Sequence, residues 1–165
     1  ITLTFNVGNA ESNGFEFDFT SLITDNWTLS GAASFLDSTL TEDYRRSASS
    51  PEPDAPSGSR LPRVPEVKWN VSTRYTFANE WFAQAAYMYT GDSYNDLFGG
   101  GRQLQGSYDV VNASFGLERS SWTAELYVQN LTDERGDVWI NDQNWDERVT
   151  INQPRTIGFR WQQRF

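Results

Sequence analysis

Apolar and polar residues alternate with a period of two along most of this chain, and the pattern recurs in seven segments. Successive side chains of a β-strand point to opposite faces, so the alternation predicts strands with one apolar and one polar face. The segments cover roughly residues 1–23, 27–35, 68–77, 81–90, 108–118, 122–129 and 156–165. The predicted fold class is therefore all-β, with about seven antiparallel strands.

The connections between these segments are alternately short and long. Only residues 24–26, 78–80 and 120–121 separate the strands of three pairs, whereas residues 39–64, 92–106 and 131–153 form the other connections. Outer-membrane β-barrels have tight turns at the periplasmic end and long extracellular loops. A soluble Greek-key sandwich has no reason to place every long loop at one end, so the pattern favours a transmembrane barrel.

Aromatic residues make up 15% of the chain and mark one end of the strands. Trp27, Trp81 and Trp122 each open a strand that leaves a short turn, and Phe165 ends the chain at the same level. A ring of aromatic residues at one height is typical of an interfacial girdle. The alternative is that each Trp caps a soluble core.

The polar face of the predicted strands carries charges. Arg74, Glu125, Arg160 and Arg164 all fall on it and are predicted to face the lumen of a barrel. Arg160 and Arg164 are expected to pair with Glu125, or with carboxylates of neighbouring strands and of a plug. Alternation alone does not decide whether the apolar face lies inside or outside; the girdle and the loop asymmetry favour lipid outside.

Composition excludes several classes of function. The net charge of -9 disfavours binding to nucleic acid, and no apolar run is long enough for a transmembrane helix. The chain has no Cys and no His, which removes thiolate chemistry and the commonest general base. We expect no enzymatic activity, no cofactor and no catalytic residue. Seven strands are also an odd number, and residues 1–12 do not resemble a signal peptide, so the chain is expected to begin partway through a larger barrel.

Four segments resemble characteristic segments of one protein family, and they occur in the same order as in that family. PRTIGFRWQQRF (154–165) resembles the last strand of a TonB-dependent receptor, and NLTDE (130–134) is similar to the segment that ends the strand before it. NVGNAESNGFEFDF (6–19) resembles the family's N-x-G-x-A-x-x-x-G-x-E strand, and GSRLPRVPEVKWNVSTRYTF (58–77) its passage from a loop into a strand. Together these segments span essentially the whole chain.

This resemblance implies that residues 1–165 are the C-terminal segment of a 22-stranded barrel in the Gram-negative outer membrane, with the plug domain outside the chain. Such a receptor takes up a scarce nutrient, such as a ferric siderophore, with energy from the TonB complex. Its partners would be outer-membrane lipid, its own plug and remaining strands, and the TonB complex through the missing N-terminal part. Phe165 matches the aromatic C-terminus that the barrel-assembly machinery recognises in this family.

Several loop residues are candidates for contact with a ligand. Trp139, Asn144 and Trp145 combine aromatic rings with an amide, and Arg102 follows a run of glycines. These side chains could stack on and hydrogen-bond a ligand, or they could pack the loops onto their neighbours. The acidic stretch 133–147 lacks the Asp-x-Asp-x-Asp-Gly spacing of a calcium loop, so it is predicted to be a solvated loop rather than a cation site.

Three other functions are alternatives to a receptor. A small stand-alone outer-membrane barrel, structural or adhesive, would need an even number of strands. A soluble all-β binding module such as a lectin would stay monodisperse without detergent. A phospholipase-type enzyme of the outer membrane would require a His.

Overall fold

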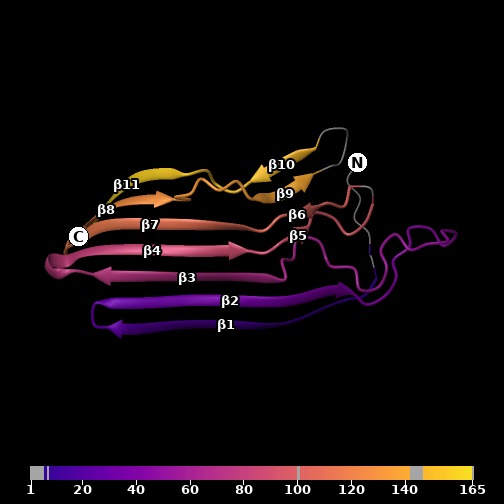
Figure 1. Ribbon diagram of the computed structural model, residues 1–165, viewed down its shortest axis with the longest axis horizontal. Coiled ribbons are helices and arrows are strands. Elements are labelled where there is room, and N and C mark those ends of the chain that lie inside the picture. The colour runs from indigo at the N-terminus through magenta and orange to yellow at the C-terminus, as the bar shows by residue number, and fades with distance from the viewer. Residues whose placement is uncertain (1–5, 7, 100, 142–146, 165) are drawn as a thin grey trace.

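A computed structural model describes residues 6, 8–99, 101–141 and 147–164. Its main feature is one seven-stranded antiparallel sheet in the order β1-β2-β3-β4-β7-β8-β11 (Figure 1). The strands are β1 (Ala10–Thr24), β2 (Trp27–Leu40), β3 (Val67–Thr76), β4 (Trp81–Thr90), β7 (Tyr108–Glu118), β8 (Trp122–Gln129) and β11 (Thr156–Gln163). A single 3₁₀ turn, Ala78–Glu80, joins β3 to β4. The prediction of seven antiparallel strands is confirmed; residues 1–5 of the first predicted segment lie outside the described residues.

The short turns all lie at one end of the sheet and the long connections at the other (Figure 1). Two of the three long connections contain short strand pairs that the sequence did not predict. β5 (Ser93–Tyr94) and β6 (Leu104–Gln105) pair beyond the end of β4 and β7. They continue the register of the last β4–β7 pair, which is Thr90 opposite Tyr108. β9 (Asp137–Asn141) and β10 (Arg148–Ile151) form a further hairpin between β8 and β11.

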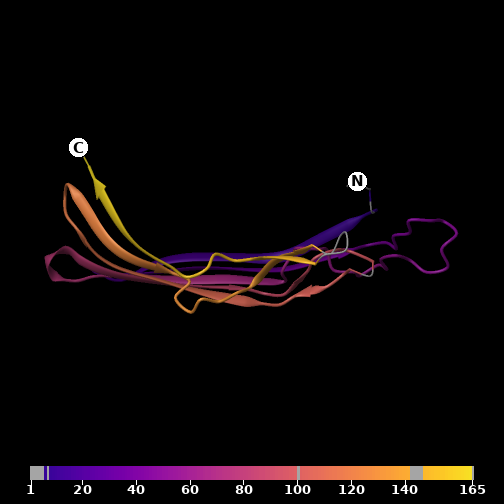
Figure 2. The same ribbon diagram turned by 90° about the horizontal axis from the view of Figure 1, so that it is seen from above.

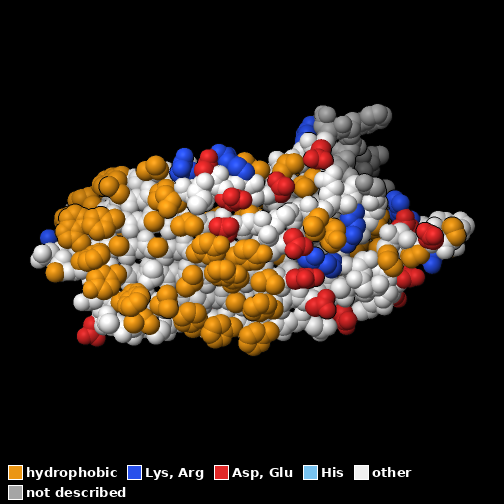
Figure 3. Space-filling view, in the orientation of Figure 1, with side chains coloured by type: hydrophobic (Ala, Val, Ile, Leu, Met, Phe, Trp, Pro, Cys, Tyr) orange, Lys and Arg blue, Asp and Glu red, His pale blue; other side chains and the backbone are white. Residues whose placement is uncertain are grey.

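One face of the sheet is covered by apolar side chains (Figure 3). Strand pairing aligns the alternating positions, so that Phe115 on β7 lies between Ala83 on β4 and Leu126 on β8. The large exposed side chains of this apolar face include Phe15, Phe17, Phe35, Trp69, Tyr75, Trp81, Phe115, Leu126, Ile157, Phe159 and Trp161. An apolar patch of this extent requires an apolar environment.

The height of the apolar face matches a lipid bilayer. From Val67 to Phe77 the chain rises about 33 Å at about 3.3 Å per residue. For strands tilted by about 40°, that length corresponds to about 25 Å along the membrane normal, which is the height of the apolar band on outer-membrane barrels. Among the described residues, no helix is long and apolar enough to cross a membrane.

The most buried apolar side chains of the described residues do not lie between two sheets. Leu40, Ala55 and Leu97 form a small cluster where the connection between β2 and β3 meets the connection between β4 and β7. The sheet is curved (Figure 2). Phe82 is buried on its polar face. A soluble β-sandwich would instead bury its alternating apolar positions against a second sheet, so this packing disagrees with a soluble module.

Candidate functional site

Charged residues on the polar face form a belt close to the short turns. Glu118 on β7 binds two guanidinium groups: Arg74 on β3 at 2.8 Å and Arg164 at 3.3 Å. Glu125 on β8 binds Arg160 on β11 at 2.8 Å. The belt therefore holds three guanidinium groups but only two carboxylates, which leaves one positive charge in excess.

Aromatic rings hold two of these guanidinium groups in place. The Arg74 guanidinium lies 3.8 Å from the centre of the Phe82 ring, and that ring covers Gly116 on the neighbouring strand. Arg160 lies 5.1 Å from the ring centre of Tyr127. Glycine is required at position 116, because a Cβ atom there would lie 2.7 Å from Cζ of Phe82.

Tyr127 repeats this arrangement over Gly158 on β11, where a Cβ atom would meet the tyrosine ring at 2.5 Å. Each unit thus consists of an arginine stacked on an aromatic ring that fills the space above a glycine. Stacking of this kind stabilises the charged guanidinium group and limits its motion. The two units fix positive charges on the polar face.

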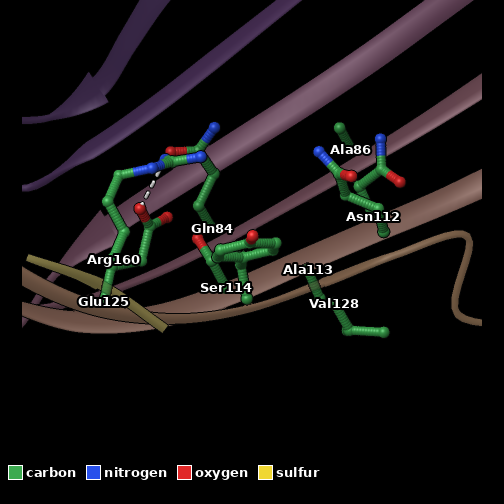
Figure 4. Close-up of a pocket in the computed structure, with 10 residues that line it drawn as sticks. Gln84, Ala86, Asn112, Ala113, Ser114, Glu125, Val128 and Arg160 are labelled. Carbon is green, nitrogen blue, oxygen red and sulfur yellow. Dashed lines mark hydrogen bonds and ion pairs between the residues drawn. The ribbon is translucent and has the colours of Figure 1, made fainter. Parts of the chain in front are cut away.

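A hollow of about 140 Å³ lies beside the second unit (Figure 4). Arg160 and Glu125 border it on one side, and Gln84 and Ser114 also line it. Among the described residues, the side chains of Gln84 and Ser114 have no hydrogen-bond partner. The hollow therefore offers unpaired polar groups next to a fixed cation.

The long connections pack against one another at the opposite end of the sheet. Arg60 binds Glu66 at 2.9 Å and Asp92 at 2.8 Å, which joins the first connection to the second. Asn95 joins the second to the third, because its Nδ2 donates to the carbonyl oxygen of Ile140 at 3.3 Å. The three connections therefore form one layer.

This loop layer contains two arginines that stack on aromatic rings. The Arg63 guanidinium lies 5.2 Å from the Trp139 ring centre, and that of Arg102 lies 3.4 Å from the Tyr94 ring centre. Within the described part of the chain, neither arginine has an acidic partner, and Nε of Arg102 is buried without a hydrogen bond. Their positive charges are therefore available to an anionic group.

The sequence indicated Trp139 and Arg102 as candidates but missed their partners. Nothing in the sequence paired Trp139 with Arg63 or Arg102 with Tyr94. The Arg63–Trp139 contact joins distant segments, which no local pattern could reveal. Arg102 and Tyr94 meet across the β5–β6 hairpin, whose strands are too short to show a period. The other two candidates, Asn144 and Trp145, lie outside the described residues. Among the described residues, no group of three or more possible ligands could hold a metal ion.

Asn130 anchors the third connection where it leaves the sheet. Its side chain is 2% exposed, and its Nδ2 donates to the carbonyl oxygens of Glu134 at 2.9 Å and Gln153 at 2.8 Å. Its Oδ1 accepts the backbone N–H of Glu134 at 2.9 Å. The backbone N–H of Arg155, aided by the Arg135 guanidinium, lowers the pKa of the nearby Asp133 carboxyl.

The three tryptophans predicted to form a girdle lie on the apolar face beside the short turns. Trp81 stacks on Phe115 and Trp122 on Trp161, whereas Nε1 of Trp27 donates to Oγ1 of Thr73 at 2.7 Å. Contact of these rings with lipid headgroups stays a prediction. Phe165, predicted for the same level, lies outside the described residues.

Comparison with known proteins identifies the family. Residues 1–131 match the model of the family described as "TonB dependent receptor-like, beta-barrel". The chain belongs to this family. Its barrels are outer-membrane proteins of Gram-negative bacteria, and the family consists of transport receptors rather than enzymes.

Curated relatives of this TonB-dependent receptor segment are themselves receptors. It is 30% identical over 160 residues to the metal-pseudopaline receptor CntO of Pseudomonas aeruginosa, an alignment that covers 88% of the chain and 21% of CntO. It is also 30% identical over 94 residues to the probable TonB-dependent siderophore receptor PiuA of Acinetobacter baumannii, which covers 56% of the chain and 13% of PiuA. The chain thus spans about a fifth or less of the length of these relatives.

Solved receptor structures share the fold. The siderophore receptor PiuA from Acinetobacter baumannii aligns with a TM-score of 0.78 at 24% identity, over 94% of the chain and 22% of PiuA. The ferric yersiniabactin uptake receptor FyuA from Yersinia pestis aligns with a TM-score of 0.75 at 21% identity, over 94% of the chain and 24% of FyuA. These alignments confirm that the sheet has the architecture of a segment of a receptor barrel.

Proposed function

We propose that this chain is the C-terminal segment of a receptor that takes up a scarce nutrient, such as a ferric siderophore, across the outer membrane. The observation that carries this function is the combination of an exposed apolar face of bilayer height with an opposite face that bears a belt of charges. The names of the relatives, which include a siderophore receptor and a metal-pseudopaline receptor, support a metal chelate as the nutrient.

The proposal assigns the remaining strands and the plug domain to the part of the receptor outside this chain. Lipid would contact the apolar face, and Arg74, Glu125, Arg160 and Arg164 would face the lumen. Energy would come from the TonB complex through the receptor's N-terminal part. Phe165 would be recognised by the barrel-assembly machinery.

The loop layer would supply the ligand contacts of this segment. Trp139 and Arg102 are the proposed contacts, with Arg63 and Tyr94 as the residues that hold them. Asn144 and Trp145 join the set on sequence grounds alone. No catalytic step is assigned to any residue.

Uptake of radioactive iron tests this function. The complete receptor would be expressed in a host that lacks its own siderophore receptors, and cells would be supplied with a panel of ⁵⁵Fe chelates with and without an uncoupler. We expect accumulation of at least one chelate that ceases when the proton gradient is dissipated. Binding without accumulation, or accumulation that continues in the presence of the uncoupler, would contradict energised uptake.

A further inference from the structure

We infer that a second hollow, on the apolar face, and the arginines beside it form a binding site for one membrane lipid with an anionic phosphate headgroup. An acyl chain of this lipid lies in the hollow, and its phosphate binds Arg155 and Arg135. Such a site requires only the proposed contact of the apolar face with lipid, and it is independent of the nutrient that the receptor takes up.

The hollow lies where β7, β8 and β11 pair, and it has a volume of about 330 Å³. Val128 on β8 pairs with Ala113 on β7 and with Ile157 on β11. Phe115 and Leu126 form the next row toward the short turns and are 48% and 61% exposed, so they rise beside the smaller side chain of Ala113. The five residues that line the hollow from the apolar face all have apolar side chains. A hydrocarbon chain fits this lining, whereas a polar group would lose its hydrogen bonds there.

Arg155 lies at the border of the apolar face on the side of the long connections. It precedes Ile157 by two residues, so alternation places it on the same face and one row farther from the short turns. The chain from Arg155 to Gln163, which pairs with Trp122 beside the short turns, spans about 26 Å at about 3.3 Å per residue. For a strand tilt of about 40°, Arg155 stands about 20 Å above Trp122, near the top of an apolar band of about 25 Å. The long arginine side chain can reach the headgroups from there.

The guanidinium group of Arg155 has no acidic partner within the described part of the chain. There it donates only to the carbonyl oxygen of Leu131, at 3.4 Å. Arg135 lies close by, because its Nη2 binds the Asp133 carboxylate at 3.0 Å and the backbone N–H of Arg155 binds the same carboxylate at 2.9 Å. Two exposed guanidinium groups therefore lie around one carboxylate.

Two other carboxylates near this border leave the arginines unpaired. Asp109 lies on β7, which is two strand spacings, or about 10 Å, from β11. Glu134 lies in the same connection as Arg135, but among the described residues neither Glu134 nor Asp109 forms an ion pair with Arg135 or Arg155. Phosphate oxygens can therefore bind the two guanidinium groups, whose paired N–H donors match them.

The apolar and cationic surfaces are continuous, which identifies the occupant as a lipid. Leu131 is 46% exposed, and its N–H binds the carbonyl oxygen of Val111 on β7 at 2.7 Å, so it lies between the hollow and the Arg155 guanidinium. Charged side chains gather along the border of the apolar area (Figure 3). A free phosphate ion would leave the hollow empty, and an uncharged lipid would leave the guanidinium groups unpaired. A lipid with an anionic phosphate fills both parts, because its headgroup layer of about 5–8 Å lies directly above its hydrocarbon.

Photolabelling of the complete receptor in lipid vesicles tests this site. The probes are phosphatidylglycerol and phosphatidylcholine with the same diazirine-bearing acyl chain, each added in small amount to vesicles of unlabelled phosphatidylcholine. Mass spectrometry of the digested receptor measures the lipid attached to the β8 and β11 peptides, with the β3 peptide as internal reference. We expect phosphatidylglycerol to label β8 and β11 about fivefold more than phosphatidylcholine does, which corresponds to about 1 kcal/mol for one arginine at an anionic headgroup. The β3 peptide should show no preference.

Three variants separate this site from a general attraction of the receptor for anionic lipid. Arg155→Gln removes the unpaired charge but keeps the backbone N–H that binds Asp133, and it should abolish the preference. Arg148→Gln is the matched control, because Arg148 on β10 is exposed and forms no ion pair among the described residues, and the preference should remain. Ala113→Phe fills the hollow and should lower the labelling of β8 and β11 by both lipids relative to β3.

Equal labelling of β8 and β11 by the two lipids in the unmodified receptor would overturn the inference. A preference that survives Arg155→Gln, or that Arg148→Gln abolishes as well, would also overturn it. Unchanged labelling in Ala113→Phe would mean that no acyl chain occupies the hollow, with the same consequence. Iron uptake by a receptor without the lipid preference would refute this site alone, whereas the preference in a receptor that takes up no chelate would refute only the proposed function.

Discussion

Replacement of Asn130 tests how the third long connection is held to the sheet. Asn130→Ala removes three side-chain hydrogen bonds, two to backbone carbonyls and one from a backbone N–H, in a place where Asn130 is 2% exposed. A buried polar group without a partner costs about 1–3 kcal/mol. Because water can enter and reach some of these groups, we expect a total loss of about 3–5 kcal/mol rather than the full sum.

The backbone conformation at position 130 adds a second, smaller loss of stability in Asn130→Ala. Asn130 has φ of 52°, in the left-handed region that alanine adopts at a cost of about 1 kcal/mol. Asn130→Gly removes the hydrogen bonds without this cost, so it separates the contribution of the hydrogen bonds from that of the backbone conformation. Asn79→Ala is the matched control, because Asn79 also has a left-handed φ of 62° but is exposed and has no side-chain hydrogen bond among the described residues.

Hydrogen–deuterium exchange at the Glu134 amide measures the effect locally. A loss of about 3 kcal/mol raises the exchange rate by about two orders of magnitude, whereas the Asn79→Ala control should change the amides around its own turn by about tenfold at most. If Asn130→Ala accelerates exchange no more than Asn79→Ala does, the side-chain hydrogen bonds do not hold the connection and the reasoning fails.

Three further predictions address other parts of the molecule. Gly116→Val should destabilise the barrel by about 1–3 kcal/mol in denaturant unfolding, because Phe82 and a backbone oxygen occupy the space of the new side chain. The backbone N–H and then the guanidinium of Arg46 lower the pKa of Asp54, so NMR titration should give a value below 3.8, and the stabilisation of this loop should be lost as the pH falls through that value. Trp139→Ala should weaken chelate binding by about fivefold, as measured by fluorescence quenching, since an aromatic contact contributes about 1 kcal/mol.

Each of these predictions has a result that counts against it. Gly106→Ala, with open space around its Cβ position, should leave stability unchanged, so equal losses in the two glycine variants would exclude a clash with Phe82. A pKa of Asp54 at or above 3.8 would mean that its contacts with Arg46 do not persist in solution. Unchanged affinity in Trp139→Ala would remove this residue from the ligand site.

The sequence predicted the sheet well because alternation is a local property. Arg74, for example, was assigned to the polar face from its position alone, and the structure places it there beside Glu118. The hairpin extensions were missed because β5 and β6 have two residues each, too few for a period to show.

The contacts within the site depend on strand register, which alternation does not determine. Alternation places Phe82 on the polar face, but its burial follows from Gly116 on the adjacent strand. Alternation places Glu118 on the polar face, but it does not show that Glu118 binds both Arg74 and Arg164. Finding such contacts requires knowing which positions lie side by side.

The central claim is that the apolar face of this sheet contacts lipid and the polar face does not. Spin labels placed one at a time at residues 70–73 of β3 test it in the complete receptor in lipid vesicles. We predict strong relaxation by lipid-soluble oxygen at Val71 and Thr73, and little at Asn70 and Ser72. Oxygen access without this alternation, or with the opposite alternation, would contradict the account.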